Sequence, residues 1–235
     1  MHKIKFFDPH THNVIREFTD PVFGLDYTPG LHGSLEGNAT IKVEASSESF
    51  LKSLKENSHF VKIFRDNQVP YGAIVESATI NHGVCTLNVI GWDQLTDKME
   101  LMATHKANAI GEKTTVKKED PSWAVTFASD SPLGVFYCIM KEFRNTIIAR
   151  GEKPFFELGN ILSYIASNTG ETFAREYRLN SLEFPTMKSV LAKVFEDSEM
   201  DIITVTVDDS DVFSWKLDVL SSYRTVQLSS SLVRD

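Results

Sequence analysis

The sharpest arrangement of residues that could do chemistry lies near the N-terminus, where the chain reads Asp8-Pro9-His10-Thr11-His12 after an apolar segment. In an extended strand successive side chains alternate between faces, so His10 and His12 would lie on the same face. Two imidazoles on one face can share a metal ion. This spacing leaves open a metal-dependent hydrolase that uses His10 and His12.

The motif is similar to the His-x-His of metal-dependent amidohydrolases and related phosphoesterases, which ends their first strand. Those enzymes are (β/α) barrels, and their remaining ligands come from the ends of later strands. Here the residues that follow have the pattern of antiparallel strands, and the histidines at 32, 59, 82 and 105 have no acidic partner in register. We therefore expect two exposed turn histidines, with no catalytic residues, no metal and no cofactor, in a protein that is not an enzyme.

Acidic residues form two further groups that could bind Ca²⁺ or serve a glycosidase. They are Glu196, Asp197, Glu199 and Asp201 after a helical pattern, and Asp208, Asp209 and Asp211 between two strand patterns. Neither group has the alternating oxygen ligands and central glycine of an EF-hand loop. We interpret them as a solvated helix end and a polar turn. The sequence has no nucleophile elbow, P-loop or dinucleotide-binding fingerprint.

Composition narrows the class of protein. The 235 residues carry a net charge of −8, which argues against sequence-independent binding to nucleic acid or to an anionic membrane. The two cysteines, Cys85 and Cys138, lie in apolar patterns and suggest buried thiols rather than disulfides. No segment approaches the ~20 apolar residues that span a bilayer, and the N-terminus lacks the apolar core of a signal peptide. We expect the chain to fold in a cytosol.

The elements that would position these residues begin with strands at 3–7, 14–18 and 39–45, separated by an irregular stretch over 21–37. A short helix follows, with Ser47 as its cap. The stretch from Phe60 to Trp92 has three apolar runs with period two, which predicts an antiparallel meander. Asn81 and Gly83 suit the positive φ of its second turn. A helix over 93–102 completes an N-terminal antiparallel β-barrel at 1–103.

The second half of the chain predicts a smaller α+β domain at 104–235 that contains helices. Residues 105–122 read as a polar loop and 123–128 as a strand. Pro132 and Gly151 bound a predicted helix over 132–149. Further apolar periodicity predicts helices over 156–168 and 186–198, and strands over 178–184, 201–207, 212–219 and 225–228. The fold class expected is therefore α+β.

The order of these features resembles the hub proteins at the tip of bacteriophage tails: baseplate hubs, tail-associated minor tail proteins and the hub part of type VI secretion spikes. The matching stretches are VKIFRD followed by VPYGAIVES, then IGWDQLTDKM, and later LNSLEFPTMKSVLAKVFEDSEMDIITVTVDD. The similarity spans residues 3 to 228. Hubs of this family usually carry two related barrels, of which the second would begin here around Val226. We expect it to be missing from these residues or supplied by a partner chain.

The resemblance implies a structural role in the virion, at the tail tip, after assembly in the host bacterial cytoplasm. Subunits would form a ring, a homotrimer in this family, around the DNA channel. The ring would join the tail tube or distal tail protein above to a spike, fibre or tape-measure protein below, without sequence-specific nucleic acid contacts or membrane binding of its own. We expect the meander around Phe60, Ile63, Tyr71 and Ile74 to build the oligomer interface.

A third class of function is a β-rich module that binds carbohydrate or a receptor. Such modules use exposed aromatic rings as stacking platforms, and the candidates here are Trp92, Trp123 and Trp215. Trp92 and Trp215 fall on apolar strand patterns, which disfavours this interpretation. An exposed Trp123 would favour it.

Overall fold

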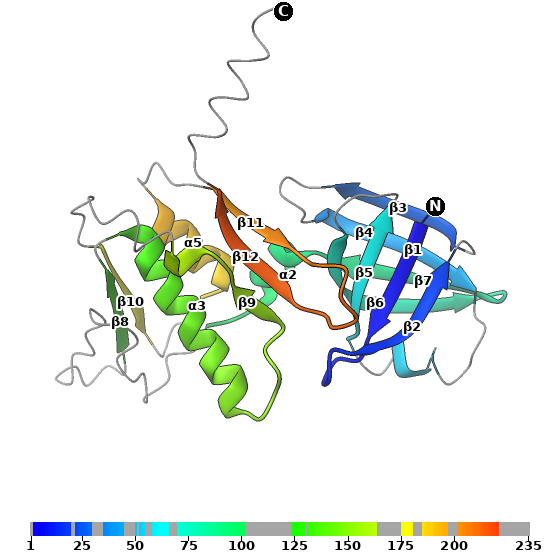
Figure 1. Ribbon diagram of the computed structural model, residues 1–235, viewed down its shortest axis with the longest axis horizontal. Coiled ribbons are helices and arrows are strands. Elements are labelled where there is room, and N and C mark those ends of the chain that lie inside the picture. The colour runs from blue at the N-terminus through cyan, green and yellow to red at the C-terminus, as the bar shows by residue number, and fades with distance from the viewer. Residues whose placement is uncertain are drawn as a thin grey trace, which may run out of the picture. The chain divides into compact units, whose positions relative to one another are not determined.

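The chain is a mixed α+β protein with a large antiparallel sheet and few helices. The computed structural model (Figure 1) describes residues 2–19, 22–29, 35–44, 50, 52–54, 58–65, 70–101, 124–129, 131–163, 175–180, 185–196 and 202–220. Two compact units divide the chain. The first contains Met1–Thr96, Gly151–Glu157 and Val205–Lys216, and the second contains the remaining segments.

The first unit is therefore not contiguous, whereas the sequence suggested a single division between residues 103 and 104. Two short segments from the second half of the chain belong to it. We call Val205–Lys216 the strap. Both segments carry large buried aromatic side chains, Phe156 in one and Phe213 and Trp215 in the other. Burial of such rings is the largest favourable contribution that a short segment can make to a core, which explains their membership of this unit.

Seven antiparallel strands form the sheet of the first unit, in the order β2-β1-β5-β6-β7-β4-β3. They are β1 (His2–Phe7), β2 (Val14–Thr19), β3 (Val22–Pro29), β4 (Leu35–Glu44), β5 (Phe60–Arg65), β6 (Tyr71–Asn81) and β7 (Val84–Ile90). The meander predicted from Phe60 is confirmed as β5, β6 and β7, which lie next to one another in the sheet. Helix α2 (Trp92–Lys98) follows directly, slightly shorter than predicted.

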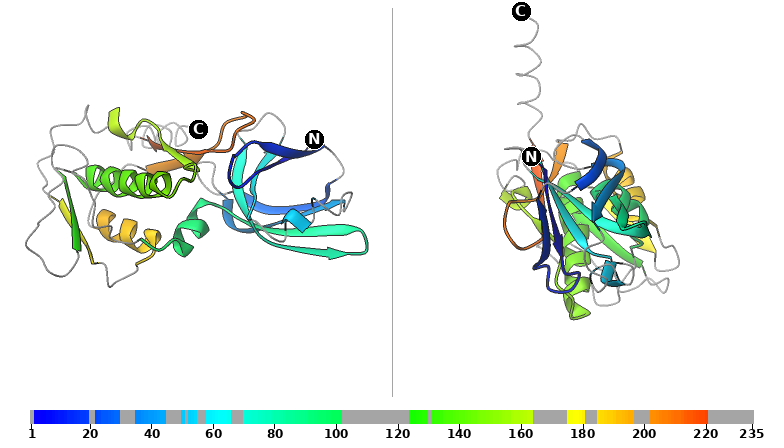
Figure 2. Two further views of the ribbon diagram at one scale, coloured as in Figure 1. Left: turned by 90° about the horizontal axis from the view of Figure 1, so that it is seen from below. Right: turned by 90° about the vertical axis from the view of Figure 1, so that its right-hand side faces the viewer.

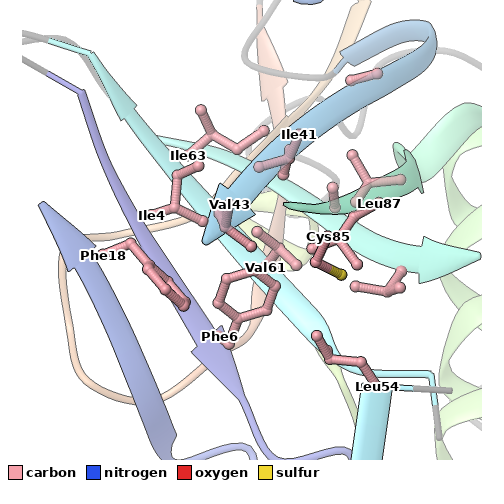
Figure 3. Close-up of a cluster of buried hydrophobic side chains, with 14 residues drawn as sticks. Ile4, Phe6, Phe18, Ile41, Val43, Leu54, Val61, Ile63, Cys85 and Leu87 are labelled. Carbon is pink, nitrogen blue, oxygen red and sulfur yellow. The ribbon is translucent and has the colours of Figure 1, made fainter. Parts of the chain in front are cut away.

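Alternation along the strands directs one side chain in two into the core of this unit, as Figure 3 shows for Ile4, Phe6, Val61 and Ile63. The ladder between β1 and β5 places Ile4 opposite Ile63 and Phe6 opposite Val61. These four side chains are 0% exposed. Their period-two spacing is the reason why the N-terminal strands could be predicted from sequence.

Two local predictions in this unit were wrong in part. The stretch over 21–37 is not irregular throughout, because β3 spans Val22–Pro29 and β4 begins at Leu35. The ladder between β3 and β4 shifts register at Val22/Gly24 and at Asp26/Thr28, so its glycine and proline content obscured the strand pattern. In the β6–β7 turn the positive φ predicted for Gly83 is confirmed, at 80°. The other positive φ, 47°, belongs to His82 rather than to Asn81, which ends β6.

The second unit holds α3 (Pro132–Ala149), α5 (Met187–Phe195) and the two-stranded sheet of β8 (Ala124–Ser129) and β10 (Arg175–Asn180). Helix α3 matches its prediction. Ser131 is its N-cap and accepts a hydrogen bond from the backbone N–H of Gly134, while Gly151 follows its end with φ of 81°. Thr186 caps α5, which is shorter than the predicted 186–198. The predicted strand over 178–184 is instead β10, and residues 181–184 lie outside the described residues.

A three-stranded sheet has the order β11-β12-β9 and contains β11 (Ile202–Thr206), β12 (Trp215–Leu220) and β9 (Phe156–Leu158). The helix predicted over 156–168 is wrong at its start, because Phe156–Leu158 form a strand. The N–H of Trp215 donates to the carbonyl of Phe155, and the N–H of Gly159 donates to that of Leu217. Pairing with β12 thus replaces helical hydrogen bonds, and helix begins only at Ile161.

The remaining predictions on this stretch concern the strands over 201–207, 212–219 and 225–228. The first two correspond to β11 and β12, although β12 starts three residues later, at Trp215. Residues 225–228 lie outside the described residues, as do the polar segment over 105–122, Ser47 and Trp123. Among the described residues, none of the helices is long and apolar enough to cross a membrane.

Candidate functional site

The His10/His12 motif forms a tight turn between β1 and β2 rather than an extended strand. Asp8 accepts hydrogen bonds at its Oδ1 from the backbone N–H groups of His10 and Thr11, at 2.9 and 2.7 Å. The bond from Thr11 is the main reason why the pKa of Asp8 lies below its usual value. This turn separates the two histidines, since His10 is exposed and His12 is buried.

His12 adopts a positive φ of 61° and is only 1% exposed. Its ring packs edge-on against Phe60, with 4.9 Å between ring centroids, and its Nδ1 has no hydrogen-bond partner among the described residues. Burial lowers the pKa of His12 to about 4, and the nearby charge of Lys153 adds to this effect. At neutral pH the imidazole is therefore uncharged. Across the described part of the chain, no group of three or more His, Cys, Asp or Glu side chains could hold a metal ion.

The acidic turn of the strap, Asp208–Asp211, does contain a concentrated polar site, but its partners are two lysines of the sheet. Lys5 on β1 and Lys62 on β5 lie directly opposite each other in the ladder. The Nζ atom of Lys62 donates to Asp208 Oδ1 at 3.0 Å and to the carbonyls of Ser210 and Val212, both at 2.9 Å. Lys5 donates to Asp211 Oδ1 at 2.8 Å. We call this arrangement the lysine clamp.

The pKa values of the two lysines of the clamp shift in opposite directions. Lys62 is 0% exposed, and burial lowers its pKa against the opposing effect of the hydrogen bond to Asp208. Burial also acts to lower the pKa of Lys5, but the hydrogen bond to Asp211 and the charges of Asp211 and Asp209 raise it overall. The pKa of Asp208 is lowered, because hydrogen bonds from Ser210 and Lys62 outweigh its partial burial.

Lys62 cannot present its amine to a substrate. A lysine whose pKa is lowered by burial is a common nucleophile in enzymes, but that chemistry needs access from solvent. Lys62 has no exposed surface, and its three donor positions are matched by three oxygens. The clamp therefore fixes the strap to the sheet.

Aromatic contacts also hold the strap against β5 and against the start of α2. Phe213 stacks on Phe60 at 4.6 Å between centroids, and Trp215 lies edge-on to both Phe213 and Trp92, at 4.8 and 5.4 Å. Gly72 on β6 permits this approach. A Cβ atom there would lie 2.6 Å from Trp215 Nε1 and 2.7 Å from Val207 Cγ1.

All four residues expected at an oligomer interface belong to the first unit, and two of them are buried in it. Ile63 is 0% exposed in the sheet core, and Phe60 is 5% exposed within the aromatic cluster. A side chain with no exposed surface makes no direct contact with another chain. Tyr71 and Ile74 are partly buried. Trp92 and Trp215 are 5% and 1% exposed, so neither offers a stacking platform to a carbohydrate.

Sequence reasoning missed Lys5 and Lys62. The available signal was a lysine at an interior position of each apolar strand pattern, in KIKFF and FVKIF. Acidic partners for such lysines are expected somewhere in the fold, because buried charges are paired. Asp208 and Asp211 were recognised as a polar turn, but their separation from these lysines along the chain concealed the pairing.

Comparisons with known proteins give no independent assignment for this arrangement. No protein-family model matches the chain, and no curated protein matches it either.

Proposed function

We propose that the chain is a structural subunit of a phage tail tip or baseplate. It would form a hub ring that joins the tail tube to the spike or receptor-binding apparatus and surrounds the DNA channel. The proposal rests on the order of features along the chain, which resembles that of tail hub proteins. The observation that carries it is a seven-stranded, wholly antiparallel sheet whose centre is the Phe60–Trp92 meander.

The two ends of this sheet support assembly. β2 and β3 are its outermost strands, and within the described residues no ladder joins them. With seven antiparallel strands, β2 and β3 run in the same direction, so closing the sheet into a barrel on its own would require one parallel pair. Open sheet edges are templates for pairing with another chain. Contacts between subunits would cover an open edge of this sheet and build the ring.

The lysine clamp and the charge of the chain are consistent with a mechanical role. The strap is fixed to the sheet by polar contacts of the buried Lys62 amine and by aromatic contacts. The net charge of −8 would discourage DNA from adhering to the ring as it passes. A trimer, as in the family that the chain resembles, would present one subunit face to the tube and the other to the spike.

Solution mass by light scattering, combined with electron microscopy of the same sample, tests the proposal. We expect a closed oligomer with a central channel, a trimer in the simplest case, that needs no added metal. A monomer at every concentration would overturn the ring. A monomer that holds a stoichiometric transition metal, lost in a His10→Ala, His12→Ala variant, would replace it with the metal-dependent hydrolase.

A further inference from the structure

The first unit has a third open sheet edge, on the second half of β6. β5 pairs only with Tyr71–Ile74 of β6, and the last contact on this side is the hydrogen bond from the N–H of Val75 to the carbonyl of His59. β7 accompanies β6 to Asn81 on the other side. Within the described residues, no strand pairs with Ser77–Asn81 on the side away from β7. Figure 2 shows the β6–β7 hairpin projecting from the sheet.

This edge lacks the features that protect open edges. Its sequence is Ser77-Ala78-Thr79-Ile80-Asn81, without a charge or a proline, and Ile80 is 38% exposed. Soluble proteins usually place charges, prolines or bulges on exposed edges to prevent pairing between chains. The only bulge here, at Val75/Ser77, comes before this stretch. An uncharged edge with an exposed Ile80 and no proline is suited to pairing with another strand.

Strand direction determines which edge of another copy can pair with β6 in antiparallel fashion. In a ring made by rotation about an axis along the strands, every copy keeps its strand directions. β2 and β3 run the same way, so pairing β2 with the β3 of a neighbour would be parallel. β6 is three antiparallel steps away from β2 and three from β3, so it runs opposite to both. An antiparallel contact in the ring therefore joins β6 to an outermost strand.

β2 has the better-defined edge. The strap already pairs with its start, through hydrogen bonds from Val14 N–H to the carbonyl of Asp211 and from Phe213 N–H to that of His12. Residues Ile15–Thr19 remain beyond this contact. Ile15 is 42% exposed and lies at a register shift of the ladder to β1, whereas Arg16–Thr19 pair regularly with β1. Two β2 strands paired about a central twofold axis would place Arg16 opposite Arg16, or Glu17 opposite Glu17, and like charges directly opposite are destabilising. The uncharged β6 edge avoids this penalty.

We propose that the β6 edge of one copy, Ser77–Asn81, pairs antiparallel with Ile15–Thr19 of β2 in the next copy. This inference rests on the ring proposed above and specifies its contact. In the register that overlaps both stretches fully, Phe18 lies opposite Ala78 and Glu17 lies opposite Thr79. Phe18 belongs to the sheet core and Ala78 packs against it, so this register keeps core-facing residues of both copies on one face.

A double variant, Glu17→Cys with Thr79→Cys, tests the pairing in the full chain. Directly opposite residues have Cβ atoms about 4.5–5.5 Å apart, close enough for a disulfide after a small adjustment. Both positions are exposed, and the native Cys85 and Cys138 are buried. After mild oxidation, a denaturing gel without reductant should show a ladder that ends at the subunit number of the ring. The matched control is Glu17→Cys with Lys42→Cys, because Lys42 is exposed on the interior strand β4.

We expect at least tenfold more cross-linked product from the test pair than from the control, and none from either single variant. Light scattering on the same samples separates the two proposals. An oligomer with no excess of cross-linking overturns the β6–β2 contact and leaves the ring intact, whereas a monomer overturns both. Strong cross-linking of Thr79→Cys alone overturns the contact in favour of a twofold one.

A second variant provides a test without disulfides. Thr79→Glu places a negative charge directly opposite Glu17 of the next copy in this register, without altering a buried side chain. It should raise the dissociation constant of the oligomer at least tenfold while the circular dichroism spectrum stays unchanged. An unchanged dissociation constant would also overturn the contact.

Discussion

Replacement of Asp208 by Asn should destabilise the first unit by removing the charge that faces Lys62. Asn keeps an oxygen that can accept the hydrogen bonds from Ser210, which reach Asp208 Oδ1 at 3.1 Å from the backbone and 2.6 Å from the side chain. The turn is therefore retained, and the change isolates the ion pair. Lys62 stays 0% exposed and keeps only the carbonyls of Ser210 and Val212 as full partners.

The magnitude follows from the unequal burial of the pair. Breaking a fully buried ion pair costs about 3–5 kcal/mol, and breaking an exposed one costs about 0–1 kcal/mol. The side chain of Lys62 is 0% exposed but that of Asp208 is 74% exposed, so an intermediate value applies. We expect a loss of about 2 kcal/mol in the free energy of unfolding. For a unit of this size that lowers Tm by roughly 8 °C.

Urea unfolding monitored by tryptophan fluorescence is a suitable assay, because Trp215 lies in the strap and Trp92 beside it. A double-mutant cycle with Lys62→Met distinguishes pairing from other effects. Lys62→Met removes the buried charge altogether, so it should cost less than Asp208→Asn, and the double variant should match Lys62→Met alone. Asp209→Asn is the control, since Asp209 is as exposed as Asp208 but its nearest lysine contact is at 3.7 Å, to Lys5, rather than at hydrogen-bond distance to Lys62.

The pH dependence gives an independent check on the same pair. The pKa of Asp208 is lower in the folded state than its ordinary value of 3.8, so the carboxylate contributes stability above that value. This contribution is lost as pH falls through the folded pKa. The difference in the free energy of unfolding between wild type and Asp208→Asn should therefore be complete at pH 6 and should disappear in strong acid. Equal stability of the two proteins at pH 6 would refute the assignment of the clamp.

Two other predictions concern the strap and the turn that packs near it. Gly72→Ala should destabilise the first unit by about 1–3 kcal/mol in urea unfolding, because the new Cβ would overlap Trp215 and Val207. The control is Gly24→Ala, whose Cβ would meet only an ordinary contact at 3.5 Å, so it should show no such overlap penalty. His12 has a folded pKa of about 4 against 6.5 when unfolded, so wild type should lose roughly 3 kcal/mol of stability as pH falls from 7 to 4. Asn tolerates positive φ, so His12→Asn should keep the turn and lose less stability over that pH range. The exposed-site control His10→Asn should behave as wild type. Equal dependence of stability on pH in all three proteins would contradict the role of His12.

Local pattern was sufficient to predict the regular elements with strong periodicity. The alternation from Phe60 to Ile90 gave three strands, and the apolar spacing between Pro132 and Ala149, with a serine cap and a following glycine, gave α3. These signals lie within a few residues of the structure that they predict. Where the local signal was ambiguous, as at Phe156–Leu158, backbone pairing with β12 decided for strand over helix.

The sequence by itself determined the fold class, the antiparallel meander and the helix α3, because period and capping act over short distances along the chain. Only the tertiary structure decided that the strap joins the first unit and that Lys5 and Lys62 find their carboxylates there. Lys62 and Asp208 are 146 positions apart, and Lys5 and Asp211 are 206 apart. No local preference encodes such a pairing. It arises because the buried rings of Phe213 and Trp215 bring the acidic turn over the sheet, where burial of the lysines then requires their charges to be matched.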